Sequence, residues 1–231
     1  MSEWRSGGYF LVGPVKEGVV KDGRLPSVLW SASTCVSDSY PDESYLDWVA
    51  STPEKEAELR KALDLSDEAL GELKAHATEL FSADLVRWPN VLASLAVARD
   101  LYRRWFRNLA GLRLIGVALR SRDVPGFLAA IRAHSNPHDG VASLLGEDRP
   151  PGGGEAWGFE VLGYDFGLFH TYLCHGLEAE LMDVLGVRFN ERGLIGAWSD
   201  AVKVSEWINR DEVGAEPVPW FPWRIDGYPL E

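Results

Sequence analysis

Ten tryptophans are spread along this chain of 231 residues, and they constrain its fold more than any other feature. They occur in both halves without clustering, at Trp4, Trp30, Trp48, Trp88, Trp105, Trp157, Trp198, Trp207, Trp220 and Trp223. Large aromatic side chains dominate the energetics of protein cores, so we expect most of the ten to be largely buried. A chain of this length can bury most of its apolar surface without disulfides. We therefore predict one compact domain over residues 1–231.

The local patterns predict a mixture of strands and helices. Short β-rich or buried apolar runs predict strands at 8–15, 27–34, 112–119 and 158–164. Capping residues followed by apolar side chains at helical spacing predict helices that begin near Pro53, Ser66, Pro89, Asp123, Thr171 and Ser199. Strands and helices do not alternate regularly, which favours an α+β fold over a doubly wound parallel sheet. We expect several helices packed on a small mixed or antiparallel sheet.

Two segments rich in proline are predicted to lie outside helices. Residues 136–155 have the composition of a loop that ends in Pro150-Pro151-Gly152-Gly153-Gly154, so residues 146–156 are the best candidate for a flexible loop. The C-terminal stretch contains four prolines, at positions 217, 219, 222 and 229. Proline in a helix interior removes a hydrogen bond and clashes with the preceding turn, so this stretch cannot be helical.

The chain is strongly acidic, with a formal net charge of -12. This charge argues against nucleic acid or an anionic membrane surface as the main partner. Its distribution is uneven: ten acids outnumber three bases between Asp38 and Glu68, whereas nine arginines face two acids between Arg87 and Arg132. An asymmetry of this kind reflects either pairing within the molecule or a surface shaped for a charged partner.

The location of the protein is predicted from what the sequence lacks. No apolar run approaches the roughly 20 residues that cross a bilayer, and the first residues do not resemble a secretory signal. The two cysteines, Cys35 and Cys174, do not make a disulfide framework. We therefore expect a cytoplasmic protein with reduced thiols, no cofactor and no membrane partner.

One short segment concentrates reactive side chains, Phe169-His170-Thr171-Tyr172-Leu173-Cys174-His175-Gly176-Leu177-Glu178. A helix is predicted from about Thr171 to Leu185. If it begins slightly earlier, His170, Cys174 and Glu178 lie on one face, four residues apart. That line could hold a metal or pair a thiol with a histidine for nucleophilic catalysis. In the alternative interpretation, Cys174 is a small buried apolar residue and His170 satisfies the start of the helix.

No complete catalytic or cofactor motif accompanies this segment. Asp165-Phe166-Gly167 matches the magnesium motif of kinases, but the glycine-rich loop, strand lysine and catalytic loop of that family are missing. The triple glycine at 152–154 is not followed by the Gly-Lys-Ser/Thr of a phosphate-binding loop. A row of arginines, Arg99, Arg103 and Arg107, has the four-residue spacing of a solvated helix face.

An acidic loop with interleaved aromatic residues is the candidate contact with a protein partner. Its members are Asp38, Tyr40, Asp42, Glu43, Tyr45 and Asp47. Tyrosine and tryptophan are enriched at binding hot spots, and neighbouring acids steer a basic partner toward them. The loop lacks the glycine and the ligand spacing of an EF-hand, so calcium is not expected there. The alternative interpretation is a hydrated surface loop without a partner.

Several stretches resemble a group of uncharacterised bacterial, mostly actinobacterial-type, cytoplasmic proteins. The similar segments are Leu29–Asp38, Phe169–Glu178, Gly214–Pro217 and Trp220–Trp223, so the resemblance covers both ends and matches the middle helices weakly. Some members have been proposed as immunity proteins of polymorphic toxin systems, and the group supplies no established catalytic residues. Together with the acidity, the missing catalytic motif and the acidic loop, the resemblance predicts an immunity-type protein that neutralises a cognate toxin by direct protein–protein contact. Many toxins act on nucleic acid and are basic, so an acidic inhibitor would gain fast, electrostatically steered association. The alternative function is a small-molecule enzyme or metal-binding protein built around His170, Cys174 and Glu178.

Overall fold

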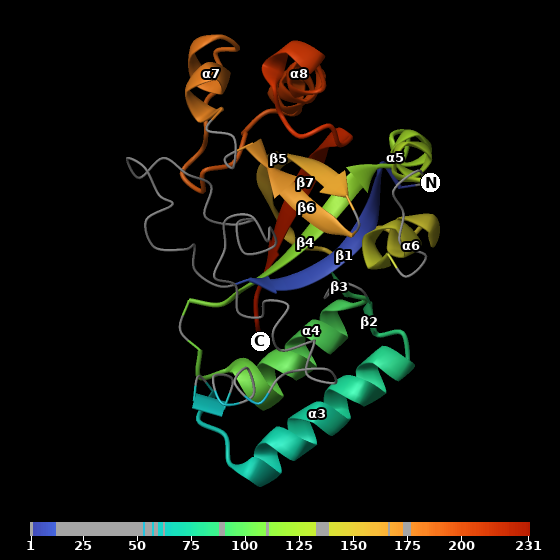
Figure 1. The fold of residues 1–231 in the computed structure, drawn as a ribbon, viewed down its shortest axis with the longest axis vertical. Helices are drawn as coiled ribbons and strands as arrows, with labels where there is room; N and C mark the ends of the chain where they lie inside the picture. Colours follow the sequence, from blue (N-terminus) through green and yellow to red (C-terminus); the bar gives the residue numbers. More distant parts are fainter. Residues whose placement is uncertain are drawn as a thin grey trace.

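The structure is a computed structural model that describes most of the chain. The described residues are 2–12, 53, 57, 60–61, 63–87, 91–109, 111–132, 139–165, 167–172 and 177–231. Within them, six α-helices pack against one curled sheet of seven strands (Figure 1). All neighbouring strands that pair are antiparallel. The predicted α+β class is therefore confirmed, with the antiparallel form of the sheet.

The sheet is built from segments that lie far apart in the sequence. Its strands are β1 (Trp4–Val12), β2 (Val86–Arg87), β3 (Val91–Leu92), β4 (Arg113–Arg120), β5 (Glu155–Asp165), β6 (Leu168–Thr171) and β7 (Trp220–Tyr228). Their order across the sheet is β2-β3-β1-β4-β7-β5-β6. The last strand in the sequence thus lies near the centre, between β4 and β5.

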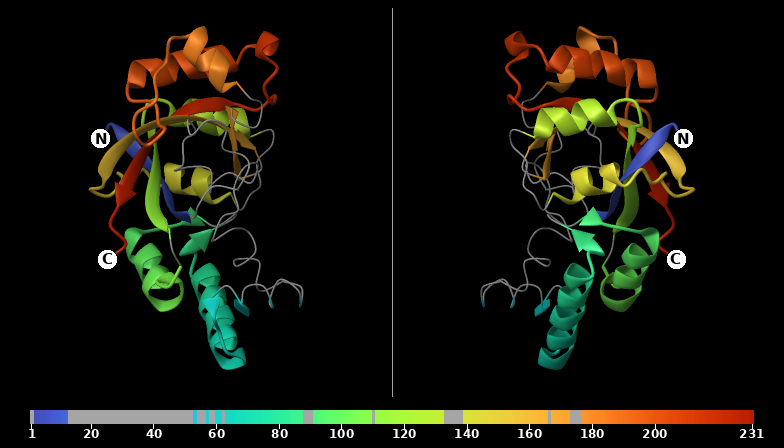
Figure 2. Two further views of the ribbon diagram at one scale, coloured as in Figure 1. Left: turned by 90° about the vertical axis from the view of Figure 1, so that its left-hand side faces the viewer. Right: turned by 90° about the vertical axis from the view of Figure 1, so that its right-hand side faces the viewer.

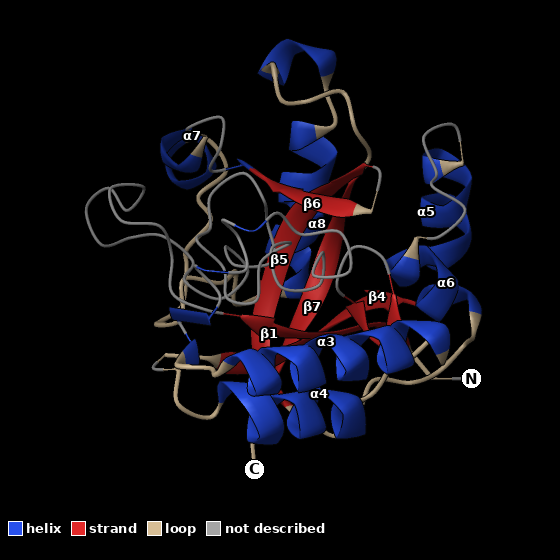
Figure 3. Ribbon diagram, turned by 60° about the horizontal axis from the view of Figure 1, so that its bottom comes forward, coloured by secondary structure: helices blue, strands red, loops and turns tan. Residues whose placement is uncertain are grey.

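The helices gather at the two ends and along one side of the sheet (Figures 1 and 2). They are α3 (Asp67–Ser82), α4 (Leu95–Leu101), α5 (Val124–Ile131), α6 (Gly140–Gly146), α7 (Glu178–Asp183) and α8 (Trp198–Ile208), with a π-helical turn η3 (Tyr102–Phe106) and a 3-10 turn η5 (Asp211–Val213). The pair α3 and α4 lies at one end, side by side beneath the sheet (Figure 3). The pair α7 and α8 lies at the other end (Figure 1).

Three apolar clusters join these layers. Alternate side chains of a strand point to opposite faces, so β4 contributes Leu114 to the cluster under α3 and α4, and Ile115 and Val117 to the cluster under α5 and α6. The third cluster joins β5 and β7 to α7 and α8, with Trp220 at its centre. Each of the seven described tryptophans is buried or half-buried, in line with the prediction, and Trp30, Trp48 and Trp88 lie outside the described residues.

The helix predicted from Ser66 is confirmed as α3. The Ser66 hydroxyl accepts a hydrogen bond from the Ala69 amide at 3.1 Å, which satisfies one of the free donors of the first turn. Leu70, Leu73 and Leu80 are buried on one face, as their spacing requires.

Two other predicted helices differ from the structure. The helix expected from Pro89 begins at Leu95, with Ser94 as its N-cap, because residues 91–92 pair with β1 and β2 as strand β3. The helix expected over 171–185 also differs at its start. Thr171 is the last residue of strand β6, because it pairs with Leu162 of β5, and helix α7 is described from Glu178 to Asp183. Residues 173–176 lie outside the described residues.

The segment expected to be a loop at 136–155 contains helix α6 and a fixed turn. The Asp139 carboxylate caps α6 by accepting a hydrogen bond from the Ala142 amide at 2.9 Å. At Gly152, the amide donates to the Tyr9 hydroxyl and the carbonyl accepts from the Tyr228 hydroxyl, both at 3.0 Å. The proposed flexible connection is thus clamped to β1 and β7.

The proline-rich C-terminal stretch forms β7, in agreement with the prediction that it is not helical. Pro222 sits inside this strand, where a missing amide would normally break a ladder. It is accommodated because β4 pairs only with residues 224–228, whereas β5 pairs with residues 220–227. At Pro222 the strand therefore has a described neighbour on one side only.

Candidate functional site

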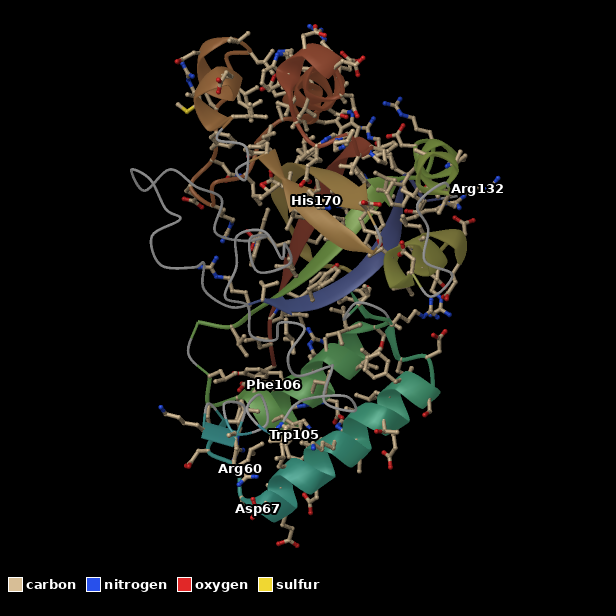
Figure 4. The ribbon with its side chains drawn as sticks, viewed as in Figure 1. Arg60, Asp67, Trp105, Phe106, Arg132 and His170 are labelled. Carbon is tan, nitrogen blue, oxygen red and sulfur yellow. The ribbon has the colours of Figure 1, made fainter. Side chains whose placement is uncertain are left out.

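His170 lies on β6 (Figure 4). Its ring meets a carboxylate from a distant part of the chain. Its Nδ1 is 2.5 Å from Oε2 of Glu216, which precedes β7. The His170 side chain is 17% exposed and that of Glu216 39%, so the pair lies at the margin of the core. A histidine ring nitrogen that donates to a carboxylate forms a charge-assisted hydrogen bond, which is stronger than one between neutral groups.

Gly163 makes the contact between His170 and Glu216 possible. In the sheet it pairs with His170 on one side and with Trp220 on the other. A Cβ atom at this position would lie 2.7 Å from Val218 Cγ2 and 2.9 Å from the Trp220 ring. Because glycine has no side chain, the segment before β7 can lie directly against β5 and bring Glu216 to His170.

A cavity of about 350 Å³ adjoins the pair, and we refer to it as the α8 pocket. It lies between the C-terminal end of α8, the turn η5 and residues 215–218. Its apolar walls come from Ile208, Ala215, Pro217, Val218 and Trp220, and its charged walls from Arg210, Asp211 and Glu216. The volume is at the lower end of the range for small-ligand sites.

Hydrogen bonds fix the walls of the α8 pocket. Asn209 Nδ2 donates to the Trp220 carbonyl at 2.8 Å, and Asn209 Oδ1 accepts from the Trp220 amide at 3.1 Å. The Trp220 indole donates to the Glu216 carbonyl at 3.1 Å. These contacts tie the end of α8 to the start of β7 and hold the main chain at Glu216 in place.

The electrostatic character of the α8 pocket favours a cation. Two carboxylates line it against one guanidinium. The pocket also lies at the C-terminal end of α8, an 11-residue helix, where the aligned peptide dipoles place a partial negative charge. Among the described residues that line it there is no cysteine, serine or threonine.

A second unusual carboxyl group, Glu160 on β5, lies inside the molecule. It is 1% exposed and stands opposite Trp223 in the ladder between β5 and β7. Burial raises the pKa of Glu160 to about 8, and the Tyr172 hydroxyl and Val161 amide offset only part of this effect. Within the described residues, neither carboxylate oxygen has a partner with good hydrogen-bond geometry. Glu160 is a neutral acid at pH 7 and does not line the α8 pocket.

The structure alters the predicted grouping of His170, Cys174 and Glu178. His170 lies on a strand and Glu178 begins α7, so the proposed single helical face does not exist. Cys174 lies outside the described residues, as does the side chain of Glu178. The residue that does meet His170 is Glu216, which the sequence analysis missed as a partner. A histidine–carboxylate contact across a sheet has no characteristic spacing, so no local signal could have revealed it.

The predicted partner-binding loop cannot be placed. Asp38, Tyr40, Asp42, Glu43, Tyr45 and Asp47 all lie outside the described residues, and their role stays a prediction. The arginine row can be placed: Arg103 and Arg107 are exposed on η3 and just beyond it. Arg99 donates to the Pro229 carbonyl at 3.2 Å. A solvated face is confirmed for the two exposed arginines.

Among the described residues, no three histidine, cysteine or acidic side chains converge on a point where they could hold a metal ion. No described helix combines the length and the apolar character needed to span a bilayer.

Comparison with known proteins identifies no relative. No protein-family model, curated protein or solved structure matches this chain.

Proposed function

We propose that the protein is a cytoplasmic, immunity-type binding protein that neutralises a basic partner, most concretely a toxin, by direct contact. The observation that carries the proposal is the excess of acid on exposed elements of a chain with net charge -12. Proteins that act on nucleic acid are commonly basic, and an acidic inhibitor gains fast, electrostatically steered association with them.

Helix α3 supports the proposal at one end of the molecule. Its apolar face is buried against the sheet and α4, so its outer face is presented to solvent as a rigid surface (Figure 3). The exposed acids on and beside this helix are Asp64, Asp67, Glu68, Glu72, Glu79 and Asp84. Arg60 pairs with Asp67 at 2.6 Å, and Arg87 pairs with Asp84 at 2.7 Å.

The opposite end supports it independently. Between Glu178 and Glu216, nine acids outnumber four bases. Most of this segment is α7, α8 and η5, which cover the third apolar cluster and present their polar sides outward. A basic partner thus meets an excess of acid at the end formed by α7, α8 and η5.

The test is co-expression with the product of the reading frame next to this gene. We expect that product to arrest growth alone, to be tolerated with this protein, and to form a complex whose association slows as salt rises. Charge reversal at Arg103 is the control and should leave association unchanged. A neighbouring metabolic operon, with no growth arrest and no complex, would contradict the proposal.

A small-molecule enzyme is the second candidate, because His170 and Glu216 form a histidine–carboxylate pair beside a cavity. Such a pair can serve as an oriented general base when a substrate lies within hydrogen-bond reach. A Cys174→Ala protein that folds but loses a measured activity would favour this candidate over binding. Stoichiometric zinc in elemental analysis would favour the metal-binding form of it.

A further inference from the structure

We propose that the α8 pocket accepts one arginine side chain of the basic partner. This inference rests on the proposed function and deepens it, because it names the chemistry of the anchor and the place where it binds. The pocket lies at the acidic end formed by α7, α8 and η5.

The charges of the pocket select a cation. Asp211 and Glu216 come from two separate segments, and the carboxylates outnumber the Arg210 guanidinium among the lining residues. The pocket also adjoins the C-terminal end of α8, whose dipole adds negative potential. His170 contacts Oε2 of Glu216, whereas the Glu216 side chain as a whole is 39% exposed and lines the pocket.

The shape of the pocket suits a long side chain with an apolar stem. Ile208, Val218 and Trp220 offer aliphatic and aromatic wall on which methylene groups can pack. Arginine and lysine both bury such stems while keeping a charged head among polar groups. Arginine is preferred, because its planar head offers five donors in fixed directions to carboxylates that reach it from different segments.

The rigidity of the walls makes the pocket suitable as an anchor site. Asn209 and Trp220 are joined by hydrogen bonds in both directions, and the Trp220 indole holds the Glu216 carbonyl. A preformed pocket avoids part of the ordering cost of binding. Arginine inserted into a preformed pocket is a common form of binding hot spot.

The experiment uses N-acetyl-arginine amide as the probe and the full chain labelled with ¹⁵N. The Trp220 indole and the Asn209 side-chain amide report directly on the pocket wall. We expect their signals to shift saturably, with a dissociation constant of about 1–10 mM for a single side chain. The neutral isostere N-acetyl-citrulline amide should produce no saturable shift, and N-acetyl-lysine amide should bind at least about threefold more weakly.

Variants distinguish binding in the pocket from nonspecific attraction to the acidic surface. Glu216→Gln and Asp211→Asn should each weaken arginine binding by about threefold or more, while Glu212→Gln, an adjacent acid that does not line the pocket, should not. Asp211 is exposed, so its variant keeps the test valid if Glu216→Gln fails to fold. Equal binding of citrulline, equal binding of lysine, or equal losses in all three variants would overturn the inference.

Binding of the basic partner protein to the same variants is measured in a separate experiment. If a basic protein forms a complex that is insensitive to Glu216→Gln and Asp211→Asn, the pocket inference fails and the proposed function stands. If the complex weakens about tenfold or more in these variants and not in Glu212→Gln, the pocket is the anchor site. Failure to form any complex bears on the proposed function, whereas the probe titration still decides whether the pocket binds arginine.

Discussion

Replacing Glu160 by glutamine tests how strongly its burial couples the fold to pH. Glutamine keeps the shape of the side chain but cannot ionise. Burial raises the pKa of Glu160 from 4.5 to about 8 in the folded protein. Below pH 4.5 the carboxyl group is protonated in both states, and its ionisation does not affect stability. As the pH rises above 4.5, the unfolded chain releases this proton while the folded protein retains it, so the free energy of unfolding falls.

The loss of stability follows from the two pKa values of Glu160, 4.5 in the unfolded chain and about 8 in the folded protein. Each pH unit between them lowers the free energy of unfolding by about 1.4 kcal/mol, which sums to about 5 kcal/mol at pH 8, and the loss stops above that pH. Glu160→Gln should therefore be more stable than the parent protein at pH 8, with an advantage that shrinks steadily toward pH 5. Burial also raises the pKa values of Asp139 and Asp226, but both proteins contain these groups, so they cancel in the comparison.

The assay is urea unfolding of both proteins at intervals from pH 5 to pH 8.5, followed by tryptophan fluorescence. Glu155→Gln, an exposed acid on the same strand, is the matched control and should follow the parent within about 0.5 kcal/mol. Unfolding curves for Glu160→Gln and the parent that stay a constant distance apart over this range would refute the reasoning.

Three further changes probe the partner loop, a helix cap and the site. Reversing charge at Asp42 and Glu43 should slow association with a basic partner and flatten its salt dependence in stopped-flow measurements, while Arg103→Glu changes little. Ser66→Ala should cost about 1 kcal/mol in urea unfolding, because α3 loses its capping hydrogen bond; an unchanged midpoint would contradict this. Gly163→Ala should lower the free energy of unfolding by about 1–3 kcal/mol through the clash with Val218 and Trp220, and should weaken arginine binding at the α8 pocket. Unchanged stability together with unchanged arginine binding would show that the segment before β7 can move aside.

Local information accounts for the elements that were predicted well. Ser66 and the leucines that follow it contain the cap and the apolar period of α3 within one stretch of sequence. Strand β4 is likewise an uninterrupted apolar run over Leu114–Leu119. Such elements can be predicted without knowing which other elements they pack against.

Long-range pairing accounts for the elements that were missed. Residues 169–171 are too short a run to separate strand from helix by pattern, and it is pairing with β5 that makes them β6. The His170–Glu216 contact depends on that strand and on the close approach at Gly163, neither of which has a periodic signature. The sequence shows both residues but does not show that His170 and Glu216 come into contact.

The central position of β7 has a consequence for how the protein folds during its synthesis. During synthesis, β1 and β4 can pair early and β5 and β6 can form a hairpin, but the strand that joins these two halves leaves the ribosome after both. Until residues 220–228 emerge, β4 and β5 each lack a neighbour that they have in the finished sheet. Unpaired strand edges invite pairing with other chains, so nascent chains that stall before Trp220 should be the form most dependent on chaperones.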